Sequence, residues 1–522
     1  MFKVIAIGLV FLAGSFGSSQ AGTVLLDQSD LEKTRWPGIM AASNLKPPAA
    51  NPREPAVKSA KGDAATLLNS LVARGQSQGF GGILYENRDR GHSSFNQDQY
   101  PNLTFVRYGP VLRRANVDYG VALSILINRP LIGNSSTALT SGYQARSLTR
   151  LAMTVTNGAS AAFLQFASNS LYIYPEHHDH DALDMYPANW LYTLNSQGSS
   201  GSDRRFVQAM LMTLAAFPKQ TRAFLEQHSL LVPTLQMIMR RNLSGVNSQA
   251  DYMSAKAHPM AFDNERLRMG RMVSQAASLN RADVAPLVHL DMLEEDFSDQ
   301  GGLAGRNEQF FTTPGAIARI WRGLQWEREF VVSAEKTTDP NGRELKFFWT
   351  TLQGDGQKIT IEPLNETGSR ARITMRWHDL YTVPPLASDG GKPRQTSRVD
   401  IGVFAYNGAM LSAPSFVSVA FPTHQKRQYG TLPDGSVQLL SIDYNAKKRE
   451  ARYDPITFWS AAWTDSFDYD DAGALEGWTR KTSKATYAFQ GDGRLADGRK
   501  VVYEPLEIVN RAPDLQFRIL DE

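Results

Sequence analysis

The chain has 522 residues, a formal net charge of +3 and no cysteine. The lack of cysteine excludes disulfides, thiolate metal ligands and a cysteine nucleophile. Its 55 lysines and arginines nearly balance 52 aspartates and glutamates, and the two signs are mixed along the chain. Nothing in this distribution indicates a nucleic-acid-binding stripe or a polybasic membrane patch.

The first residues predict export. An apolar run over residues 4–13 follows Lys3, and Ser19-Gln20-Ala21 resembles the small-x-small pattern before a signal peptidase cut. The run is far shorter than the roughly 20 residues that a membrane span needs. We therefore expect a signal peptide over residues 1–21 with cleavage near Ala21. The mature protein is expected to be periplasmic or secreted and not membrane-spanning.

The next segments predict an extended lead-in and then a mixed domain. Residues 22–62 are rich in proline and show little periodicity, which is typical of an extended segment. From Ala64 the stretch AATLLNSLVAR has helical spacing, and GGILYEN is typical of a short buried strand. Helical patterns dominate residues 203–280. We expect a mixed α/β candidate functional domain over residues 63–315.

The pattern changes after about residue 318. Short β-rich runs such as KITIEPL, ARITMRW and VDIGVFAY alternate with Asn-Gly, Asp-Gly and Gly-Ser turns, a pattern typical of an antiparallel sandwich. We expect one sandwich over residues 326–424 and a C-terminal β-rich region over 425–522. The fold class is therefore α+β, with a mixed, helix-rich N-terminal domain followed by one or more antiparallel β-sandwich modules.

One of these segments resembles a known family. Residues 338–342, TDPNG, match the Asp-Pro-x-Gly turn that opens PKD-type domains, and Leu345 and Trp349 match buried positions of the next strand. Gly354-Asp355-Gly356 lies two residues further from the tryptophan than is usual in that family. The resemblance covers about residues 328–422 and implies an immunoglobulin-like β-sandwich. It also implies a spacer or binding role and no catalysis.

The densest chemical signal is the stretch YPEHHDHDALDMYP, residues 174–187. Imidazole and carboxylate groups are ligands that zinc and other transition ions accept without sulfur. The sequence has no HExxH motif, so a bound divalent metal is a possibility only, and a solvated charged loop is the alternative. The candidate metal ligands are His177, His178, His180, Asp181 and Asp184. The candidate acid–base groups are His178 and His180, with Glu176 positioning them.

Two other polar segments are candidates. In NSQGSSGSDRRF a Gly/Ser-rich loop enters a helix at Ser202 or Asp203, so free backbone N–H groups could bind an anion. Ser199 and Arg204 are its candidate substrate contacts and Ser200 a candidate nucleophile; a flexible capped turn is the alternative. In LYENRDRGHSS the predicted substrate contacts are Arg88, Arg90 and His92, against the alternative of a salt-bridged loop.

These features favour an exported hydrolase or lyase that acts on an extracellular or cell-envelope polymer, with polysaccharide preferred. The sandwich modules would then be accessory. The alternative is a non-catalytic secreted protein that binds glycans or cations or takes part in surface assembly. We expect an extracellular polymer or glycan as the partner, no nucleic acid and no nucleotide cofactor. Whether the three polar segments meet in space decides between the two hypotheses.

Overall fold

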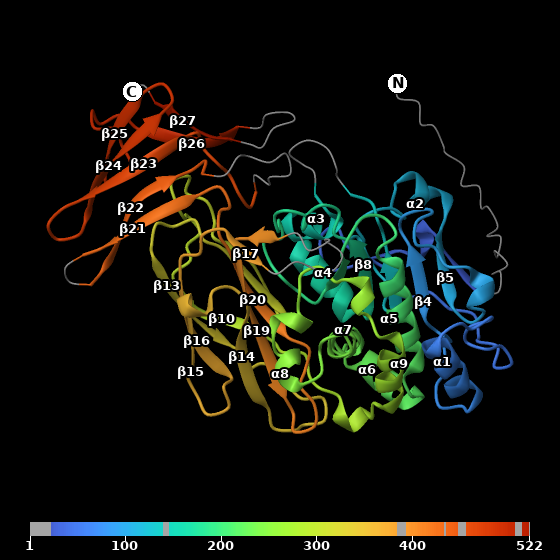
Figure 1. Ribbon diagram of the computed structural model, residues 1–522. Coiled ribbons are helices and arrows are strands. Elements are labelled where there is room, and N and C mark those ends of the chain that lie inside the picture. The colour runs from blue at the N-terminus through green and yellow to red at the C-terminus, as the bar shows by residue number, and fades with distance from the viewer. Residues whose placement is uncertain are drawn as a thin grey trace, which may run out of the picture.

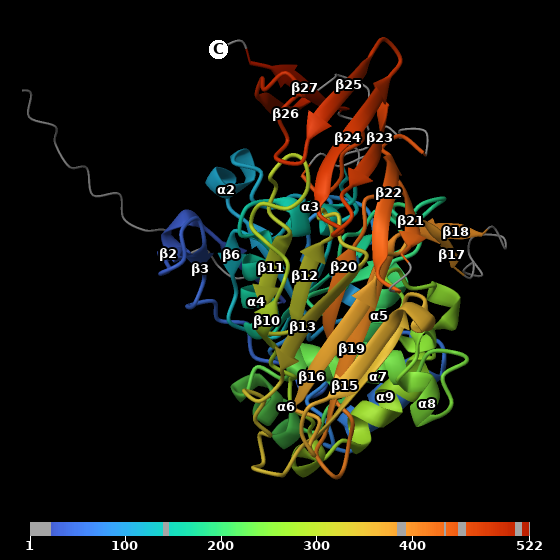
Figure 2. The same cartoon turned by 90° about the vertical axis from the view of Figure 1, so that its left-hand side faces the viewer.

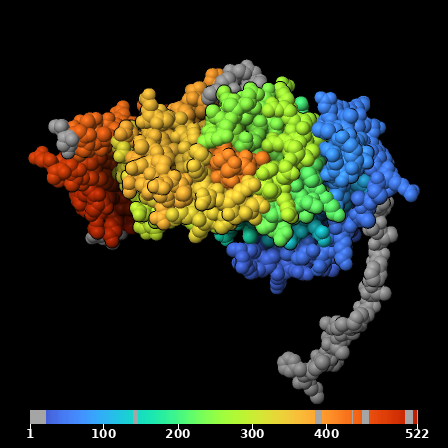
Figure 3. Space-filling model, turned by 90° about the horizontal axis from the view of Figure 1, so that it is seen from below, coloured from blue at the N-terminus to red at the C-terminus, as the bar shows by residue number. Residues whose placement is uncertain are grey.

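The computed structural model describes residues 22–138, 146–383, 393–432, 435–446, 456–506 and 514–520, so the predicted signal peptide lies outside the described residues. The chain has the expected mixed α+β fold. In Figure 3 its parts follow one another along an elongated molecule, from the N-terminal domain in blue and green to the C-terminal strands in red. Within the described ranges, no helix combines the length and the apolar character that a membrane crossing requires.

The N-terminal domain is built on a parallel sheet with the strand order β1-β5-β4-β7-β8-β9. These strands are β1 (Thr23–Leu26), β4 (Leu84–Asn87), β5 (Thr104–Tyr108), β7 (Leu131–Asn134), β8 (Ser170–Pro175) and β9 (Thr193–Ser196). All neighbours pair in parallel. β1 lies in the segment that was expected to be an extended lead-in. The start of this segment is instead an edge strand of the domain, because β1 pairs with β5.

Helices cover the sheet (Figure 1). They are α1 (Asp63–Ala73), α2 (Pro110–Arg114), α3 (Leu148–Thr154), α4 (Gly158–Ala167), α5 (Arg204–Ala216), α6 (Lys219–Gln227), α7 (Leu231–Arg241), α8 (Gln249–Tyr252) and α9 (Met269–Ser278). Tyr85 and Phe105 share a buried core with α1, α5 and α9. On the other face, Leu84 packs with Leu148 of α3 and with Ala42, which follows the small sheet of β2 (Glu32–Lys33), β3 (Met40–Ala41) and β6 (Ile125–Leu126).

The strand order reverses between β4 and β7. The chain runs from β4 outward to β5 and then returns to β7 on the opposite side of β4. In open sheets of this kind, ligands bind outside the carboxyl ends of the strands at such a switch point. The fold therefore indicates where to look for a site before any side chain is considered.

A β-sandwich follows, made of two facing sheets with the orders β10-β13-β16-β15 and β11-β12-β20-β19-β14. In Figure 2 it lies in front of the helices α5, α7 and α9. Its strands are β10 (Asp291–Glu295), β11 (Gln309–Thr313), β12 (Ala316–Ile320), β13 (Glu327–Ser333), β14 (Lys346–Gln353), β15 (Ile359–Pro363), β16 (Arg370–Arg376), β19 (Arg398–Tyr406) and β20 (Ser415–Ala420). The first strand begins at Asp291, earlier than the expected boundary at 326, because β10 pairs with β13 and β12 pairs with β20.

The C-terminal region adds antiparallel strands at one end of the sandwich (Figure 1). They are β21 (Lys426–Thr431), β22 (Val437–Asp443), β23 (Trp463–Tyr469), β24 (Leu475–Thr482), β25 (Thr486–Gln490), β26 (Val501–Leu506) and β27 (Asp514–Ile519); a separate hairpin pairs β17 (Tyr381–Val383) with β18 (Arg394–Thr396). Trp463 and Trp478 are buried here, and Trp478 stacks on Phe489 at a ring separation of 4.8 Å. These rings therefore belong to a core and do not form a sugar-stacking surface.

Candidate functional site

The three polar segments singled out in the sequence follow β4, β8 and β9, and all three lie at the carboxyl edge of the parallel sheet. Backbone hydrogen bonds join the loops there. The N–H of Arg88 donates to the carbonyl of Asn134 at 2.8 Å, and the N–H of Glu176 donates to the carbonyl of Ser196 at 2.9 Å. The loops after β4, β7, β8 and β9 thus form one continuous edge, as the enzyme hypothesis requires.

A carboxylate–imidazole pair lies directly after β4. Nδ1 of His92 is 2.7 Å from Oδ2 of Asp89. The Asp89 side chain is only 6% exposed, whereas the imidazole of His92 is 63% exposed. The carboxylate is also held from the loop after β7, where the Thr137 hydroxyl donates to Oδ1 at 3.5 Å. A fixed, buried carboxylate that orients an exposed imidazole is the arrangement of a general base.

Asp203 joins the loops at the centre of this edge. Its carboxylate accepts a hydrogen bond from the Ser93 hydroxyl at 2.5 Å and one from Nδ2 of Asn134 at 2.9 Å. Burial raises the pKa of Asp203, while the hydrogen bonds from Ser93 and Asn134 oppose the shift. Asp203 is the residue that precedes α5, as expected, but its side chain ties the β4 and β7 loops together and makes no capping hydrogen bond.

His177 lies close to the pair of Asp89 and His92. Burial lowers the pKa of His177, and the negative charge of Asp89 acts in the opposite direction. Both His177 and His178 have positive φ, 45° and 73°, which is uncommon for residues with a side chain and costs free energy. Nε2 of His177 is buried and makes no hydrogen bond to any described residue. The chain is therefore strained at this point, and a buried polar atom remains unsatisfied there.

Glu176 fastens the β8 loop to the β9 loop. Its carboxyl group accepts hydrogen bonds from the backbone N–H groups of His180 at 3.0 Å and Gly198 at 3.2 Å. Burial, together with the nearby charges of Asp181 and Asp179, raises the pKa of Glu176 to about 8. The group is therefore largely protonated at neutral pH, and its role is positional.

His180 and Asp184 face the sandwich and are buried. Nδ1 of His180 lies 3.4 Å from Asp184, which in turn forms an ion pair of 2.8 Å with Arg398 of β19. Burial lowers the pKa of His180, and the carboxylate of Asp184 acts in the opposite direction. Burial acts to raise the pKa of Asp184, but Arg398 and His180 overcome it and hold that pKa below its usual range. These two side chains connect domains and do not face a ligand.

His178 and Asp181 form a separate pair at the surface. Nδ1 of His178 is 2.7 Å from Asp181, but here the carboxylate is itself 43% exposed. The predicted metal ligands are thus divided among two pairs and His177. In the part of the chain that the structure describes, no group of three or more histidine, aspartate or glutamate side chains is arranged to hold a metal ion. A bound divalent metal remains a prediction from the sequence.

Arg88, expected to contact substrate, is instead buried under the sheet. Its guanidinium forms an ion pair of 2.8 Å with Glu86 and also donates to Tyr108 and to the carbonyls of Gly120 and Val117. Glu86 is satisfied in turn by the hydroxyl groups of Tyr108 and Tyr172. Every donor nitrogen of the guanidinium is occupied, so Arg88 is a structural residue that anchors the start of the Asp89 loop.

The remaining predicted residues are exposed. Arg90 forms an ion pair with Asp118 at 2.5 Å. Arg204 lies over the ring of Phe95 at 5.8 Å. Ser199 and Ser200 are exposed on the turn before α5. Among the described residues none hydrogen bonds to the hydroxyl of Ser200, so no base is in place to activate it as a nucleophile.

A hollow of about 700 Å³ lies beside the loop that carries Asp89 and His92, although neither of these two side chains lines it. Arg90, Gly91 and Ser94 of the same loop line it, together with residues of β4 and β5. This volume lies within the range of ligand sites, roughly 300–1,000 Å³. Polar and aromatic side chains both reach it, among them Tyr85, Asn87, Phe95 and Tyr108. The site therefore has room for a small ligand or for one unit of a polymer.

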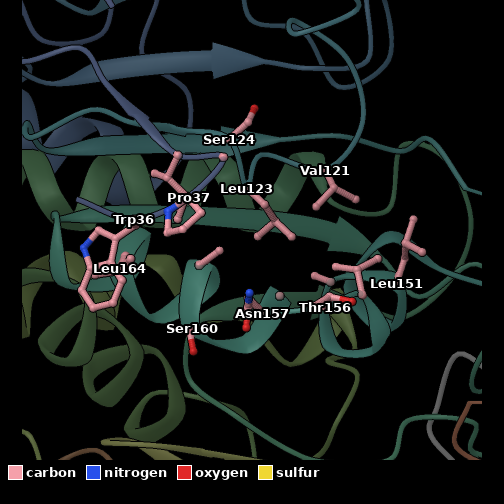
Figure 4. Close-up of a pocket in the computed structure, with 16 residues that line it drawn as sticks. Trp36, Pro37, Val121, Leu123, Ser124, Leu151, Thr156, Asn157, Ser160 and Leu164 are labelled. Carbon is pink, nitrogen blue, oxygen red and sulfur yellow. The ribbon is translucent and has the colours of Figure 1, made fainter. Parts of the chain in front are cut away.

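A second hollow, of about 490 Å³, lies under Trp36 on the α3 and α4 side (Figure 4). Trp36, Leu151 and Leu164 give it an apolar wall, and Ser124, Asn157 and Ser160 add neutral polar groups. None of its lining residues titrates near neutral pH. It therefore offers no acid–base chemistry, and the site after β4 is the better candidate.

Three of the residues that build the site were not among those expected to form it: Asp89, Asn134 and Asp203. Asp89 and Asn134 each stand at or just after the end of a buried strand, and Asp203 stands just before a helix. A polar residue directly after a buried strand is the signal that identifies this kind of position. Asp89 stands in the LYENRDRGHSS segment, among the residues expected to contact substrate, and the final set of candidates omitted it.

Comparisons with known proteins add little. No family model and no curated protein matches the chain. One solved structure is described as a nucleoside hydrolase-related hypothetical protein from Saccharophagus degradans that is associated with carbohydrate metabolism. The chain shares 10% identity with it, over 56% of this chain and 71% of that one, with a TM-score of 0.17. A score this low carries no conclusion about fold or function, so the function must be argued from the site.

Proposed function

We propose that this chain is a hydrolase or lyase that acts on an extracellular or cell-envelope polymer, with polysaccharide preferred, and that the loops after β4, β7, β8 and β9 form its active site. One observation carries the proposal. The buried carboxylate of Asp89 orients the exposed imidazole of His92 in the loop after β4, at the switch point of a parallel sheet. Arg90, Gly91 and Ser94 of the same loop line a hollow of ligand size.

His92 acts as the general base. With Nδ1–H donating to Asp89, the Nε2 lone pair faces outward. In hydrolysis Nε2 takes a proton from a water molecule. The water oxygen bonds to the carbon whose bond to the leaving oxygen breaks. The leaving oxygen takes its proton from solvent or a protein acid. In elimination the same nitrogen takes a proton from the carbon next to the one that bears the leaving oxygen. A C=C bond forms as the C–O bond breaks, and the leaving oxygen takes a proton from solvent or a protein acid. In both cases Asp89 stabilises the imidazolium ion that forms.

The structure favours this pair over His178 and Asp181. The two pairs have the same Nδ1–Oδ2 distance of 2.7 Å and the same separation of three residues in the chain. They differ in the burial of the carboxylate, 6% exposed for Asp89 and 43% for Asp181. A buried carboxylate is screened less by water, so it orients and stabilises its histidine more strongly.

The alternative, a non-catalytic protein that binds glycans or cations, is favoured by a different observation. Most of the acidic–histidine cluster is used in structural contacts, since Glu176, Asp179, His180 and Asp184 are all buried. On this alternative the same edge of the sheet binds a ligand without reacting with it. The sandwich module remains accessory in both cases, as the PKD-like resemblance implies.

The matched pairs provide the experiment. Purified protein is incubated with a panel of neutral and acidic polysaccharides, and new reducing ends and unsaturated products are measured. His92→Ala is expected to lower turnover by about 100-fold or more, the usual contribution of a general base. His178→Ala removes another largely exposed imidazole and should leave turnover within about twofold, with both variants folded as judged by circular dichroism.

Two results would contradict the proposal. Equal losses in both variants would assign the chemistry elsewhere on the edge. Retention of full turnover in His92→Ala would exclude His92 as the base. If the wild-type protein binds members of the panel and forms no product from any of them, the non-catalytic alternative is correct.

A further inference from the structure

Cationic side chains continue from the site across the starts of α5 and α9. A hollow of about 380 Å³ is lined by Phe95, Arg204, Arg205 and Gln208. It shares Phe95 with the hollow beside His92. A further hollow of about 380 Å³ shares Arg205 and Gln208 with it. The three hollows therefore adjoin, and we call the last two the basic groove. Its cationic residues are Lys61, Arg204, Arg205, Arg268 and Arg271.

The charges of this groove are not neutralised within the protein. Across the described ranges, no carboxylate lies within 4.0 Å of the charged nitrogens of Lys61, Arg204, Arg205 or Arg271, which the structure leaves exposed. Arg268 donates only to carbonyl groups and to Ser244. One acidic residue, Asp63, lines the groove. Some exposed arginines of the domain are paired, as Arg90 is with Asp118, and others, such as Arg129, are not paired with any described carboxylate; the groove differs in that several unpaired cations line one surface.

The position of these cations is unfavourable for folding. Arg204 and Arg205 begin α5, while Arg268 and Arg271 flank the start of α9, and neither helix has an acidic residue in its first turn. A positive charge at the positive end of a helix dipole is repelled by it. An anionic ligand would be attracted by these side chains and by the helix ends together. α1, α5 and α9 pack side by side, so the groove is a single surface (Figure 1).

The chemistry of the groove selects among polyanions. Arginine binds carboxylate and sulfate groups through paired hydrogen bonds. Proteins that bind single-stranded nucleic acids add exposed rings on which the bases stack. The rings that line the groove do not serve this purpose, because Tyr100 is buried and Phe95 is half-buried under Arg204. An acidic polysaccharide fits these contacts better than a nucleic acid does.

We propose that the basic groove binds the acidic groups of a polysaccharide that bears carboxylates or sulfates, and guides the chain into the hollow beside His92. This inference rests on the proposed function for the nature of the polymer, and it adds the charge class of the substrate. It also assigns Arg205, which lines both parts of the groove, as the central contact.

The test measures binding apart from catalysis. Binding of polygalacturonate, chondroitin sulfate, neutral dextran and a single-stranded oligothymidylate is compared in the full chain carrying His92→Ala, which cannot turn over substrate if the proposed function holds. The two acidic polysaccharides should bind at least about tenfold more tightly than dextran, and their binding should weaken as salt is raised. Arg205→Glu with Arg271→Glu should reduce this binding about tenfold or more, because attraction becomes repulsion.

The control is Arg129→Glu with Arg281→Glu. These exposed arginines lie away from the groove, one before β7 and one after α9, and the double change alters the net charge by the same amount. It should leave binding within about twofold. Equal loss in both double variants would mean that only the overall charge matters, and it would overturn the inference. Tighter binding of oligothymidylate than of both acidic polysaccharides would overturn it as well.

The inference and the proposed function fail in different ways. If the acidic polysaccharides bind through the groove but the wild-type protein forms no product from them, the groove is confirmed and the catalytic proposal fails. If the wild-type protein cleaves only neutral polymers and the groove variants cleave them equally well, the catalytic proposal stands and the groove inference is overturned.

Discussion

Replacing Glu176 by glutamine gives the most direct test of the electrostatics at the sheet edge. The carboxyl group is buried and accepts hydrogen bonds from the N–H groups of His180 and Gly198. Its pKa is raised from 4.5 to about 8, chiefly by burial. Between these two values the unfolded chain has released the proton and the folded chain still holds it. The wild-type protein should therefore lose stability as pH rises through this window.

The magnitude follows from the two pKa values. At about 1.36 kcal/mol for each tenfold difference in proton affinity, this group should cost the wild-type protein about 3.5 kcal/mol of unfolding free energy between pH 5 and pH 8. Glutamine does not ionise in this range. Its amide nitrogen cannot accept one of the two hydrogen bonds, which costs about 1 kcal/mol at every pH. Glu176→Gln should therefore match the wild type near pH 5 and exceed it by about 3 kcal/mol at pH 8.

Urea unfolding followed by tryptophan fluorescence at pH 5, 6, 7 and 8 measures the difference between the two proteins. The difference cancels the titration of all other groups. Glu366→Gln, which removes an exposed carboxyl group from the loop between β15 and β16, is the control and should show a difference near zero at each pH. Infrared spectra add a direct readout, since the wild type should show a protonated-carboxyl band at pH 7 that Glu176→Gln lacks. A difference that stays constant from pH 5 to pH 8, with no such band, would refute the reasoning.

Two further predictions concern the loop after β8. Arg398→Met should lower the free energy of unfolding by about 3–5 kcal/mol, because it leaves the buried carboxylates of Asp184 and Asp400 without their partner. An unchanged urea midpoint would show that the ion pairs contribute nothing. His178→Gly should raise the stability by about 1 kcal/mol, since His178 has a φ of 73° that glycine adopts without strain. A lower melting temperature in thermal denaturation would show that the imidazole contacts outweigh the backbone strain.

Local patterns could be predicted from the sequence because they depend on neighbouring residues. The helical spacing of AATLLNSLVAR corresponds to α1, and the predicted helix after Asp203 begins as α5 at Arg204. The parallel sheet was not predicted. Its strands are only four to six residues long, and a buried run of that length has no alternation that would distinguish it from a core segment.

The candidate site was predicted in its segments but not in its contacts. The loops that carry His92, His177 and Asp203 were all singled out, yet their convergence depends on strand order, which no local pattern reveals. The density of charged residues also led to the choice of the wrong site residues within these loops. Arg88 and His180 are polar residues in polar stretches, but the fold buries both of them beside carboxylates, Arg88 next to Glu86 and His180 next to Asp184.

The ion pair between Asp184 and Arg398 has a consequence for how such a protein can evolve. The N–H of Asp184 also donates to the carbonyl of Gln395 in the β17–β18 hairpin at 2.7 Å, and Arg398 of the sandwich donates to the carbonyl of Tyr186 at 2.6 Å. The sandwich therefore helps to hold the β8 loop, one wall of the site, in its position. A recombination event that exchanged this module for another would leave the buried carboxylate of Asp184 without its partner, so the two parts should be inherited as one unit.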